Sequence, residues 1–471
     1  MIRFIKYIFL ISFLILFIFG FKNYIGSKII YSIFTLTSLI MLTYSFKREY
    51  YFFEIFFCFF IFLNFWLDFV VTISFYDYFF SEGFGSFTFN KQSLDDILLL
   101  STLVCFSITF SIFLRRKYFP KKDKKLNKIK LSNKFLIFSK KYNILIYLIL
   151  TIIVGILAFI NFKYSIYQRG VANDIEINFF LKYVLQWLLL FGFASFFCVL
   201  IDLQISNNIF NKLFTLFILF ESLISNLSIL SRGNILNSSS IIFAIYKTIR
   251  VKRLNYLLFS AIFILIFFVL GIELSSPIRG DESIINSSLV FQDFKTNSES
   301  FFKEIIISIK NFFYFIFSRL FGIEALMAVY SLDGLGFDLF YKAFSYKPSI
   351  GEVSFFDALK EDYRENTLSK VSITLPGIVA FLYYSGSIYF LLFALLFITV
   401  SFSFFEFLIF KYCNSNLLLC SLFSQVIAYR LIHFGYNPSN SYMLLISIFL
   451  NVIIIIFFYK IINMIKKNFN I

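Results

Sequence analysis

The sequence is poor in charged residues and has few cysteines and one histidine. Charged residues make up 15% of its 471 positions, whereas soluble domains contain about 25%. Hydrophobic residues make up 59%, with 75 Phe among them, and the mean hydropathy is +0.83. No water-soluble core could bury so much apolar surface, so the composition excludes an ordinary soluble domain and predicts a protein embedded in lipid.

The scarcity of metal-binding side chains limits the chemistry. All five cysteines lie in or beside apolar segments, so no disulfide framework or metal-thiolate site is visible; they are Cys58, Cys105, Cys198, Cys413 and Cys420. P-loop, G-x-G-x-x-G and H-E-x-x-H motifs are absent. With one histidine, a metal site would need oxygen ligands alone. We expect no nucleotide hydrolysis and no metal or other cofactor.

The apolar stretches predict an all-α, polytopic integral membrane protein. A helix needs about 20 residues to cross the hydrocarbon core of a bilayer. By this length the chain contains about twelve spans, nine in residues 1–274 and three in residues 375–471. The predicted ranges are 4–20, 26–44, 51–74, 95–114, 143–161, 180–202, 209–229, 235–247, 255–273, 375–400, 415–432 and 441–459.

Basic residues orient these spans. The net charge is +16, and the segment 115–141 holds twelve Lys/Arg and a single acid, Asp123. Such a basic loop is typical of the cytoplasmic side of a membrane. Counting crossings from this loop places the basic tail 460–467 on the same side. We therefore expect both termini in the cytoplasm, and the positive charge needs no nucleic-acid partner to explain it.

The segment 275–374 differs from the rest of the chain because it is long and rich in charge. It carries thirteen Asp/Glu and ten Lys/Arg, and the crossing count places it outside the membrane as one large extracytoplasmic loop between the ninth and tenth spans. Near 301–329 the polar residues Glu304, Ser308, Asn311 and Ser318 recur on one helical face. We expect an amphipathic helix on the outer leaflet there and a small folded cap after it.

Three Arg-Gly pairs fall where predicted spans meet the outer surface, at Arg169, Arg232 and Arg279. Glycine after arginine lets the backbone approach a ligand, and a guanidinium holds phosphate through paired hydrogen bonds. Arg319, at the end of the predicted surface helix, is a fourth candidate. The alternative is that each arginine reaches lipid headgroups; three such pairs on one face favour an anion site.

Candidates for acid–base chemistry are fewer. His433, the only histidine, follows Arg430 in the last external hairpin, and a neutral imidazole accepts a proton near pH 7. Asp281 and Glu282 are alternative bases near the lipid surface, although adjacent loop carboxylates are more often only solvated. His433 could equally be structural. Asp68, near the outer end of the third span, is expected to face the interior of the bundle.

Three groups of motifs resemble the bacterial O-antigen and capsule polymerases, the oligosaccharide repeat unit polymerases. They are Ser231-Arg232-Gly233 before a Ser-rich helix, Arg319-x-x-Gly322-x-Glu324 in a long external loop, and Pro376-Gly377-Ile378 leading into Tyr383-Tyr384-Ser385-Gly386. The resemblance implies a metal-independent glycosyltransferase of the bacterial inner membrane. Its substrates would be oligosaccharides on undecaprenyl diphosphate, with membrane lipid and a chain-length regulator protein as partners.

The resemblance gives the candidate residues their roles. Undecaprenyl diphosphate would leave as a sugar hydroxyl attacks, and arginines would stabilise the charge on the leaving group. Two alternatives remain open: an O-antigen ligase, which transfers the glycan to lipid A-core, and a lipid-linked oligosaccharide flippase or other transporter. A transporter would be expected to have charged residues along its spans and short loops.

Overall fold

The computed structural model describes residues 2–47, 51–79, 84–118, 133–168, 179–207, 214–249, 264, 322–346, 353, 355–359, 375–435 and 438–468. Most of these residues are helical, and none of them belongs to a β-strand. They include seven helices long and apolar enough to cross a membrane, besides shorter apolar ones. The predicted all-α architecture of a multi-pass membrane protein is therefore confirmed in its coarse form.

Most helices follow the predicted apolar ranges; of the range 255–273 only residue 264 is described. The N-terminal group comprises α1 (Ile2–Asn23), α2 (Lys28–Phe46), α3 (Phe52–Ile61), the π-helix η1 (Phe62–Leu67), α4 (Asp68–Phe79) and α5 (Lys91–Tyr118). The middle group comprises α6 (Asn133–Lys163), α7 (Phe179–Trp187), the π-helix η2 (Leu188–Gly192), α8 (Phe193–Ser206), α9 (Phe214–Ile229), the 3₁₀ turn η3 (Arg232–Asn234) and α10 (Ile235–Ile249). The last group comprises α14 (Gly322–Tyr330), α15 (Phe337–Ser345), α16 (Phe355–Leu359), α17 (Gly377–Tyr383), α18 (Ile388–Tyr412), α19 (Leu417–Ile432) and α20 (Pro438–Asn468).

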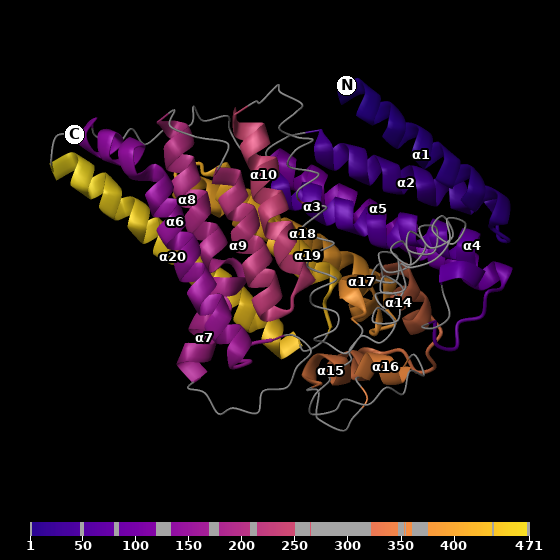
Figure 1. Ribbon diagram of the computed structural model, residues 1–471. Coiled ribbons are helices and arrows are strands. Elements are labelled where there is room, and N and C mark those ends of the chain that lie inside the picture. The colour runs from indigo at the N-terminus through magenta and orange to yellow at the C-terminus, as the bar shows by residue number, and fades with distance from the viewer. Residues whose placement is uncertain are drawn as a thin grey trace, which may run out of the picture.

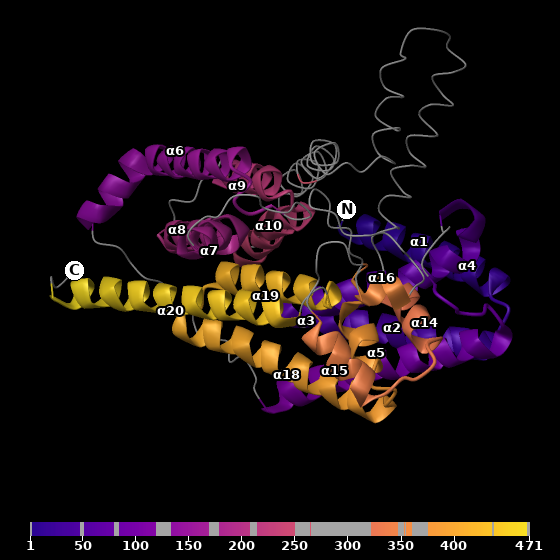
Figure 2. The same cartoon turned by 90° about the horizontal axis from the view of Figure 1, so that it is seen from below.

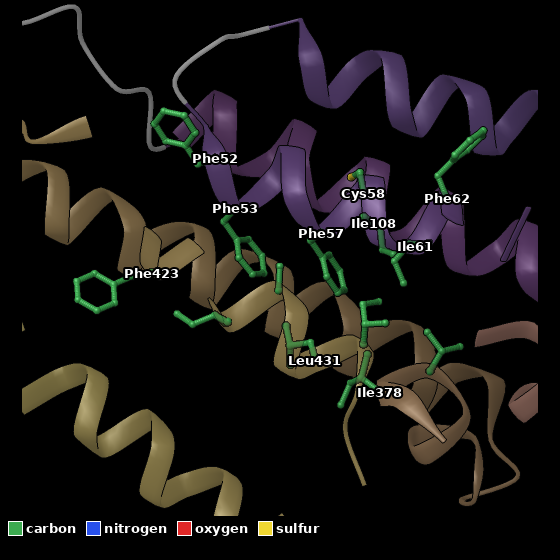
Figure 3. Packing of buried hydrophobic residues seen from close by; sticks show 14 of the residues in the cluster. Phe52, Phe53, Phe57, Cys58, Ile61, Phe62, Ile108, Ile378, Phe423 and Leu431 are labelled. Atoms are coloured by element: carbon green, nitrogen blue, oxygen red, sulfur yellow. The ribbon is translucent and has the colours of Figure 1, made fainter. Parts of the chain in front are cut away.

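Helix α19 is the centre of the bundle. It packs against α3 and α18 on one side and against α8 and α10 on the other, so it lies between the α1–α5 group and the α6–α10 group (Figure 2). Phe53 and Phe57 point from α3 toward α19, which also carries Leu431 (Figure 3). Because lipid is as apolar as these side chains, close van der Waals packing holds such helices together rather than exclusion from water.

Hydrogen bonds show which helix ends lie together. The Tyr24 hydroxyl, in the turn between α1 and α2, donates to Asp95 Oδ1 at 2.6 Å, and the Tyr330 hydroxyl donates to Asp96 Oδ2 at 2.9 Å. Burial and the hydrogen bond to Asp96 raise the pKa of Tyr330 to about 12, so this phenol stays a donor. This end of the bundle, which also holds α14–α17, is called the cap end below (Figure 1).

Both termini lie at the opposite end. α1 runs toward the cap end and α20 runs away from it, so Ile2 and Asn468 lie on the same side of the bundle (Figure 1). Helix α10 is antiparallel to α19, so it ends at Ile249 on the side away from the cap end. Helix α14, which begins at Gly322, lies at the cap end.

The predicted span 375–400 is not one helix. Helix α17 ends at Tyr383, Gly386 adopts φ +66°, and α18 begins at Ile388 after the Ser387 side chain accepts a hydrogen bond from the Phe390 amide. The apolar run hides this break because hydropathy does not register a left-handed glycine. The membrane-spanning helix is instead Ile388–Tyr412, and α17 is a short buried helix at the cap end.

Part of the predicted surface helix is also buried. Gly322–Tyr330, at the end of the range 301–329, forms α14, in which Ile323 to Val329 are inaccessible to solvent. The start of α14 packs directly on η1: a Cβ at Gly322 would lie 2.6 Å from the Asn64 carbonyl oxygen. Side chains from α4, α5 and α17 cover the rest of α14. The remainder of the predicted amphipathic helix lies outside the described residues.

The predicted basic loop 115–141 begins later than expected. Arg115 and Arg116 belong to α5 and are buried, at the end opposite the cap. Arg116 Nη2 lies 2.7 Å from Glu54 Oε2, its Nη1 donates to the Tyr44 carbonyl, and the Arg115 guanidinium stacks 3.8 Å from the Tyr51 ring centroid. The sequence predicted these two arginines in a cytoplasmic loop, whereas Glu54 binds both of them within the bundle.

Candidate functional site

A tight helical reversal forms the first wall of the site. α9 and η3 are joined by Leu230, which has φ +56°, and Ser231. The Ser231 amide donates to the Asn226 carbonyl at 3.0 Å, and the Asn234 amide donates to the Ser231 carbonyl at 3.1 Å. These bonds satisfy the backbone groups that the reversal would otherwise leave unpaired. The predicted spans 209–229 and 235–247 are therefore joined by a tight turn, and the backbone of Arg232 is part of this turn.

Helix α19 forms the second wall. Gly233 lies under the Tyr429 ring, where a Cβ would come within 2.8 Å of Tyr429 Cε1. Two turns deeper, the Ser421 hydroxyl donates to the Ser240 carbonyl at 2.7 Å and fixes the register of α10 on α19. Gly233 was predicted to let the backbone approach a ligand; in the structure it lets the Tyr429 side chain approach the backbone.

The π-helix η2 forms the third wall. A π-helical turn widens the backbone and leaves carbonyl groups out of the regular α-helical pattern, and such turns are frequent at functional sites. Here the Asn237 side chain of α10 donates from Nδ2 to the Leu190 carbonyl at 2.8 Å. This bond joins η2 to α10, and Leu190 and Phe191 lie opposite the tip of the hairpin.

These walls enclose a small pocket that is referred to below as the hairpin pocket. It is lined by Leu190, Phe191, Ser231, Gly233, Asn234, Asn237, Gln425, Val426, Tyr429, Arg430 and Leu444. The space open to the centre of a water molecule is about 20 Å³, which is room for about one water. In this conformation the pocket admits a water or a single hydroxyl group, and a whole sugar ring would require it to open.

Several polar atoms in and behind the hairpin pocket are buried and form no hydrogen bond. They are Ser231 Oγ, Asn234 Nδ2, Gln425 Oε1 and both side-chain atoms of Asn226. Each such group costs about 1–3 kcal/mol when left unsatisfied. A polar molecule at this opening, water included, would satisfy them. Arg430, half-buried at the rim, adds a guanidinium.

His433 caps the end of α19 next to this pocket. Its Nδ1 lies 3.0 Å from the Tyr429 carbonyl and its ring centroid lies 4.3 Å from that of Tyr429. A carbonyl only accepts hydrogen bonds, so Nδ1 carries the proton and the basic lone pair is on Nε2. In this tautomer Nε2 is the nitrogen that would act as a general base. The same bond also serves a purely structural C-cap.

The Pro376-Gly377 motif docks on the same helix end. Gly377, with φ +74°, donates its amide to the Phe434 carbonyl at 3.0 Å, and a Cβ there would lie 2.7 Å from the Ile432 carbonyl. Pro376 in turn fills the space beside Gly435, where a Cβ would meet it at 2.6 Å. Two motifs far apart in sequence, the Ser231-Arg232-Gly233 reversal and the Pro376-Gly377 turn, therefore both pack at the end of α19.

A pair of buried carboxyl groups lies next to this region. Asp68, at the start of α4, and Glu324, in α14, are both inaccessible to water, and the Thr72 hydroxyl approaches Glu324 Oε1 at 3.4 Å. Both side-chain oxygens of Asp68 lack a hydrogen bond, and the Ile323 amide approaches without completing one. Asp68 faces the interior as expected, but Glu324 was predicted on the surface and is not.

The sequence-predicted residues divide into two sets. The fold brings Arg430 and His433 together with the backbone of Arg232, from opposite halves of the chain. The others lie outside the described residues: Arg169, Arg279, Asp281, Glu282 and Arg319. Within the described part, no three His, Cys, Asp or Glu side chains are grouped so that they could hold a metal ion.

Sequence reasoning missed the neutral polar residues of the hairpin pocket, chiefly Asn226, Asn234, Gln425 and Tyr429. A signal for them exists, because amides inside apolar runs are costly in lipid and need a reason to be there. The candidate residues taken from the spans were chosen for their charge, so these neutral side chains were not among them. Comparison with known proteins adds no relative: no family model, no curated protein and no solved structure matches this chain.

Proposed function

We propose that this protein is a membrane glycosyltransferase that polymerises oligosaccharide units carried on undecaprenyl diphosphate, at the outer face of the bacterial inner membrane. The observation that carries the proposal is that the Ser231–Asn234 hairpin and the end of α19, with Tyr429 and Arg430, line the hairpin pocket. The Pro376-Gly377 turn packs on the residues at the end of the same helix. The resemblance to repeat unit polymerases rests in part on two of these segments, Ser231-Arg232-Gly233 and Pro376-Gly377-Ile378.

In this proposal the donor's anomeric carbon is attacked by a hydroxyl of the acceptor glycan. The carbon–oxygen bond to the diphosphate breaks, and the carrier leaves with the bonding electrons. His433 Nε2 takes the proton of the attacking hydroxyl, and Arg430 and Arg232 stabilise the developing charge on the diphosphate. The unsatisfied amides Asn234 and Gln425 hydrogen-bond sugar hydroxyls or the phosphate ester. The arginines outside the described residues, Arg169, Arg279 and Arg319, would complete the anion site.

A transporter of lipid-linked oligosaccharide is the second candidate function, because of a specific observation. Sequence analysis gave the spans little charge, yet the bundle buries Glu54, Asp68, Arg115, Arg116 and Glu221. Buried ionisable groups in membrane helices often mark substrate or ion paths. An O-antigen ligase, which shares the leaving group, is a further alternative.

The test uses the purified full-length protein with lipid-linked repeat units. We expect products longer than one repeat, and loss of these products in Arg430→Ala, while Lys411→Ala retains them because Lys411 is exposed at the opposite end of α18. Deletion of the gene should leave single-repeat caps on the lipid core. Retained polymer on its carrier with an unmodified core would identify a ligase instead, and lipid-linked units trapped at the inner leaflet would identify a flippase.

A further inference from the structure

Helix α15 presents three distinct faces. Leu339, Phe340 and Ala343 pack inward, and the Phe340 ring lies 5.6 Å from Phe381 of α17 and 5.3 Å from Phe390 of α18. At 100° per residue, Asp338, Lys342 and Ser345 form a second, polar face that is exposed. α15 is therefore bound to the fold by one side only, and the two remaining sides face outward.

The third face is aromatic and exposed. Phe337, Tyr341 and Phe344 follow one another at spacings of four and three residues, so they form a single stripe. Their side chains are 47%, 63% and 52% exposed. A water-facing helix in a folded cap would not be expected to carry only large aromatic side chains on one exposed face.

This stripe meets a surface that the fold assigns to lipid. The neighbouring helix α18 is long and apolar enough to cross a membrane, and it exposes Tyr389, Phe393 and Phe397 at four-residue intervals. The Phe337 ring touches Phe390, in the first turn of α18, with centroids 5.3 Å apart. The aromatic face of α15 is thus continuous with the lipid-facing side of α18 at its cap end.

We propose that α15 lies in the plane of the bilayer interface at the cap end, with Phe337, Tyr341 and Phe344 inserted among the lipids. Its polar face, with Asp338 and Lys342, then faces the headgroups and water. Tyrosine is enriched at this depth because its apolar ring and its polar hydroxyl are both accommodated there. Phenylalanine is common on the apolar face of helices that lie in the interface. Helices with separate apolar and polar faces bind in this orientation.

This placement has a consequence for the neighbouring elements. α15 is linked through Phe340 to Phe381 of α17, and α17 is held on the end of α19 by the Gly377–Phe434 hydrogen bond. An anchored α15 therefore fixes the depth of the α19 end, with Arg430 and His433, relative to the lipid headgroups. The inference does not depend on which reaction, if any, takes place in the hairpin pocket.

The test measures depth directly with single introduced cysteines. The native cysteines are all buried, so the parent protein labelled in parallel gives the background. Tyr341→Cys is labelled with an environment-sensitive fluorophore in liposomes of phosphatidylglycerol and phosphatidylethanolamine. Lys342→Cys, on the polar face of the same helix, is the matched control. Phe393→Cys is the lipid-embedded reference and Asp333→Cys, at an exposed position, is the aqueous reference.

We expect brominated lipids to quench the label at 341 nearly as strongly as at 393, and at least twice as strongly as at 342. Iodide in the water should quench in the reverse order. If iodide quenches 341 as it quenches 333, α15 is part of a water-exposed cap and the proposal is wrong. Protection of 341 from both quenchers would also overturn it, since a second copy or another protein would then cover the stripe. If Tyr341→Cys is not inserted, Phe344→Cys on the same stripe replaces it.

Discussion

Gly233 and Tyr429 lie so close together that only a hydrogen atom fits between the backbone of the α9–α10 hairpin and the face of the ring. Phe60 packs on another side of the same ring, with centroids 6.1 Å apart. Tyr429 is therefore wedged between two helices, and its position sets the width of the hairpin pocket.

Gly233→Ala is expected to displace Tyr429 and to reduce glycan polymerisation by about tenfold or more, since a 1.4 kcal/mol change is a factor of ten. Gly155→Ala in α6 is the control, because no atom lies within 4 Å of a Cβ there. It should leave activity unchanged and favour the helix by up to about 1 kcal/mol. Equal activity of both variants would show that the close contact is unimportant for the site.

His433→Ala is expected to lower turnover by roughly 10²–10⁴, the usual share of a general base. The bond from Nδ1 to the Tyr429 carbonyl fixes the tautomer, so His433→Gln should keep the cap and fail to restore turnover. Single-turnover assays with purified lipid-linked units measure the effect. Activity restored by glutamine would make His433 a positioning residue, and Asp281 or Glu282 would then be the stronger candidate base.

Asp68→Asn is expected to preserve or increase thermal stability in detergent. The substitution removes a buried carboxyl group whose oxygens form no hydrogen bond and which lies near Glu324, and the new amide can donate to the Glu324 carboxyl group. Asp95→Asn is the contrasting variant, because Asp95 accepts bonds from the Tyr24 hydroxyl and the Ser27 amide. Its melting temperature should fall. A marked loss of stability in Asp68→Asn would mean that the charged form is required.

Glu54→Leu is expected to be among the most destabilising single changes at the end opposite the cap. It would leave Arg115 and Arg116 buried without their carboxylate, and breaking a buried pair costs about 3–5 kcal/mol. Lys117→Ala, one residue further along α5 and exposed, should change the melting temperature little. Similar melting temperatures for the two variants would show that the Glu54–Arg115–Arg116 ion network does not stabilise the fold.

The topology has its own test. Phe340 lies at the cap end and the segment after Arg116 begins at the other end. Alkaline phosphatase fused after Phe340 should be active, and a cysteine near Lys125 should react only in permeabilised cells. An inactive fusion, with the rest of the labelling pattern unchanged, would reverse the sidedness on which the proposed function depends.

Sequence alone determined the class of protein and most helix positions, because both depend on local hydropathy and length. About twenty apolar residues in lipid form a helix because their backbone N–H and C=O groups find no water and must hydrogen-bond one another. It also placed Asp68 in the interior and marked the Ser231-Arg232-Gly233 reversal as a helical hairpin. Hydropathy did not predict a break that depends on the backbone of a single residue. Gly386 divides the apolar run 375–400 into α17 and α18 without changing the hydropathy of that run.

Only the tertiary structure decided which polar residues meet. Glu324 and Asp68 are far apart in sequence, and Gly322 brings α14 onto η1 because it lacks a Cβ. Asn234 and Gln425 come from different helices and share one pocket because α10 and α19 pack in a fixed register, set in part by the Ser421–Ser240 bond. Hydropathy acts along the chain, whereas a pocket depends on contacts between helices, and these follow from side-chain shapes that no local pattern records.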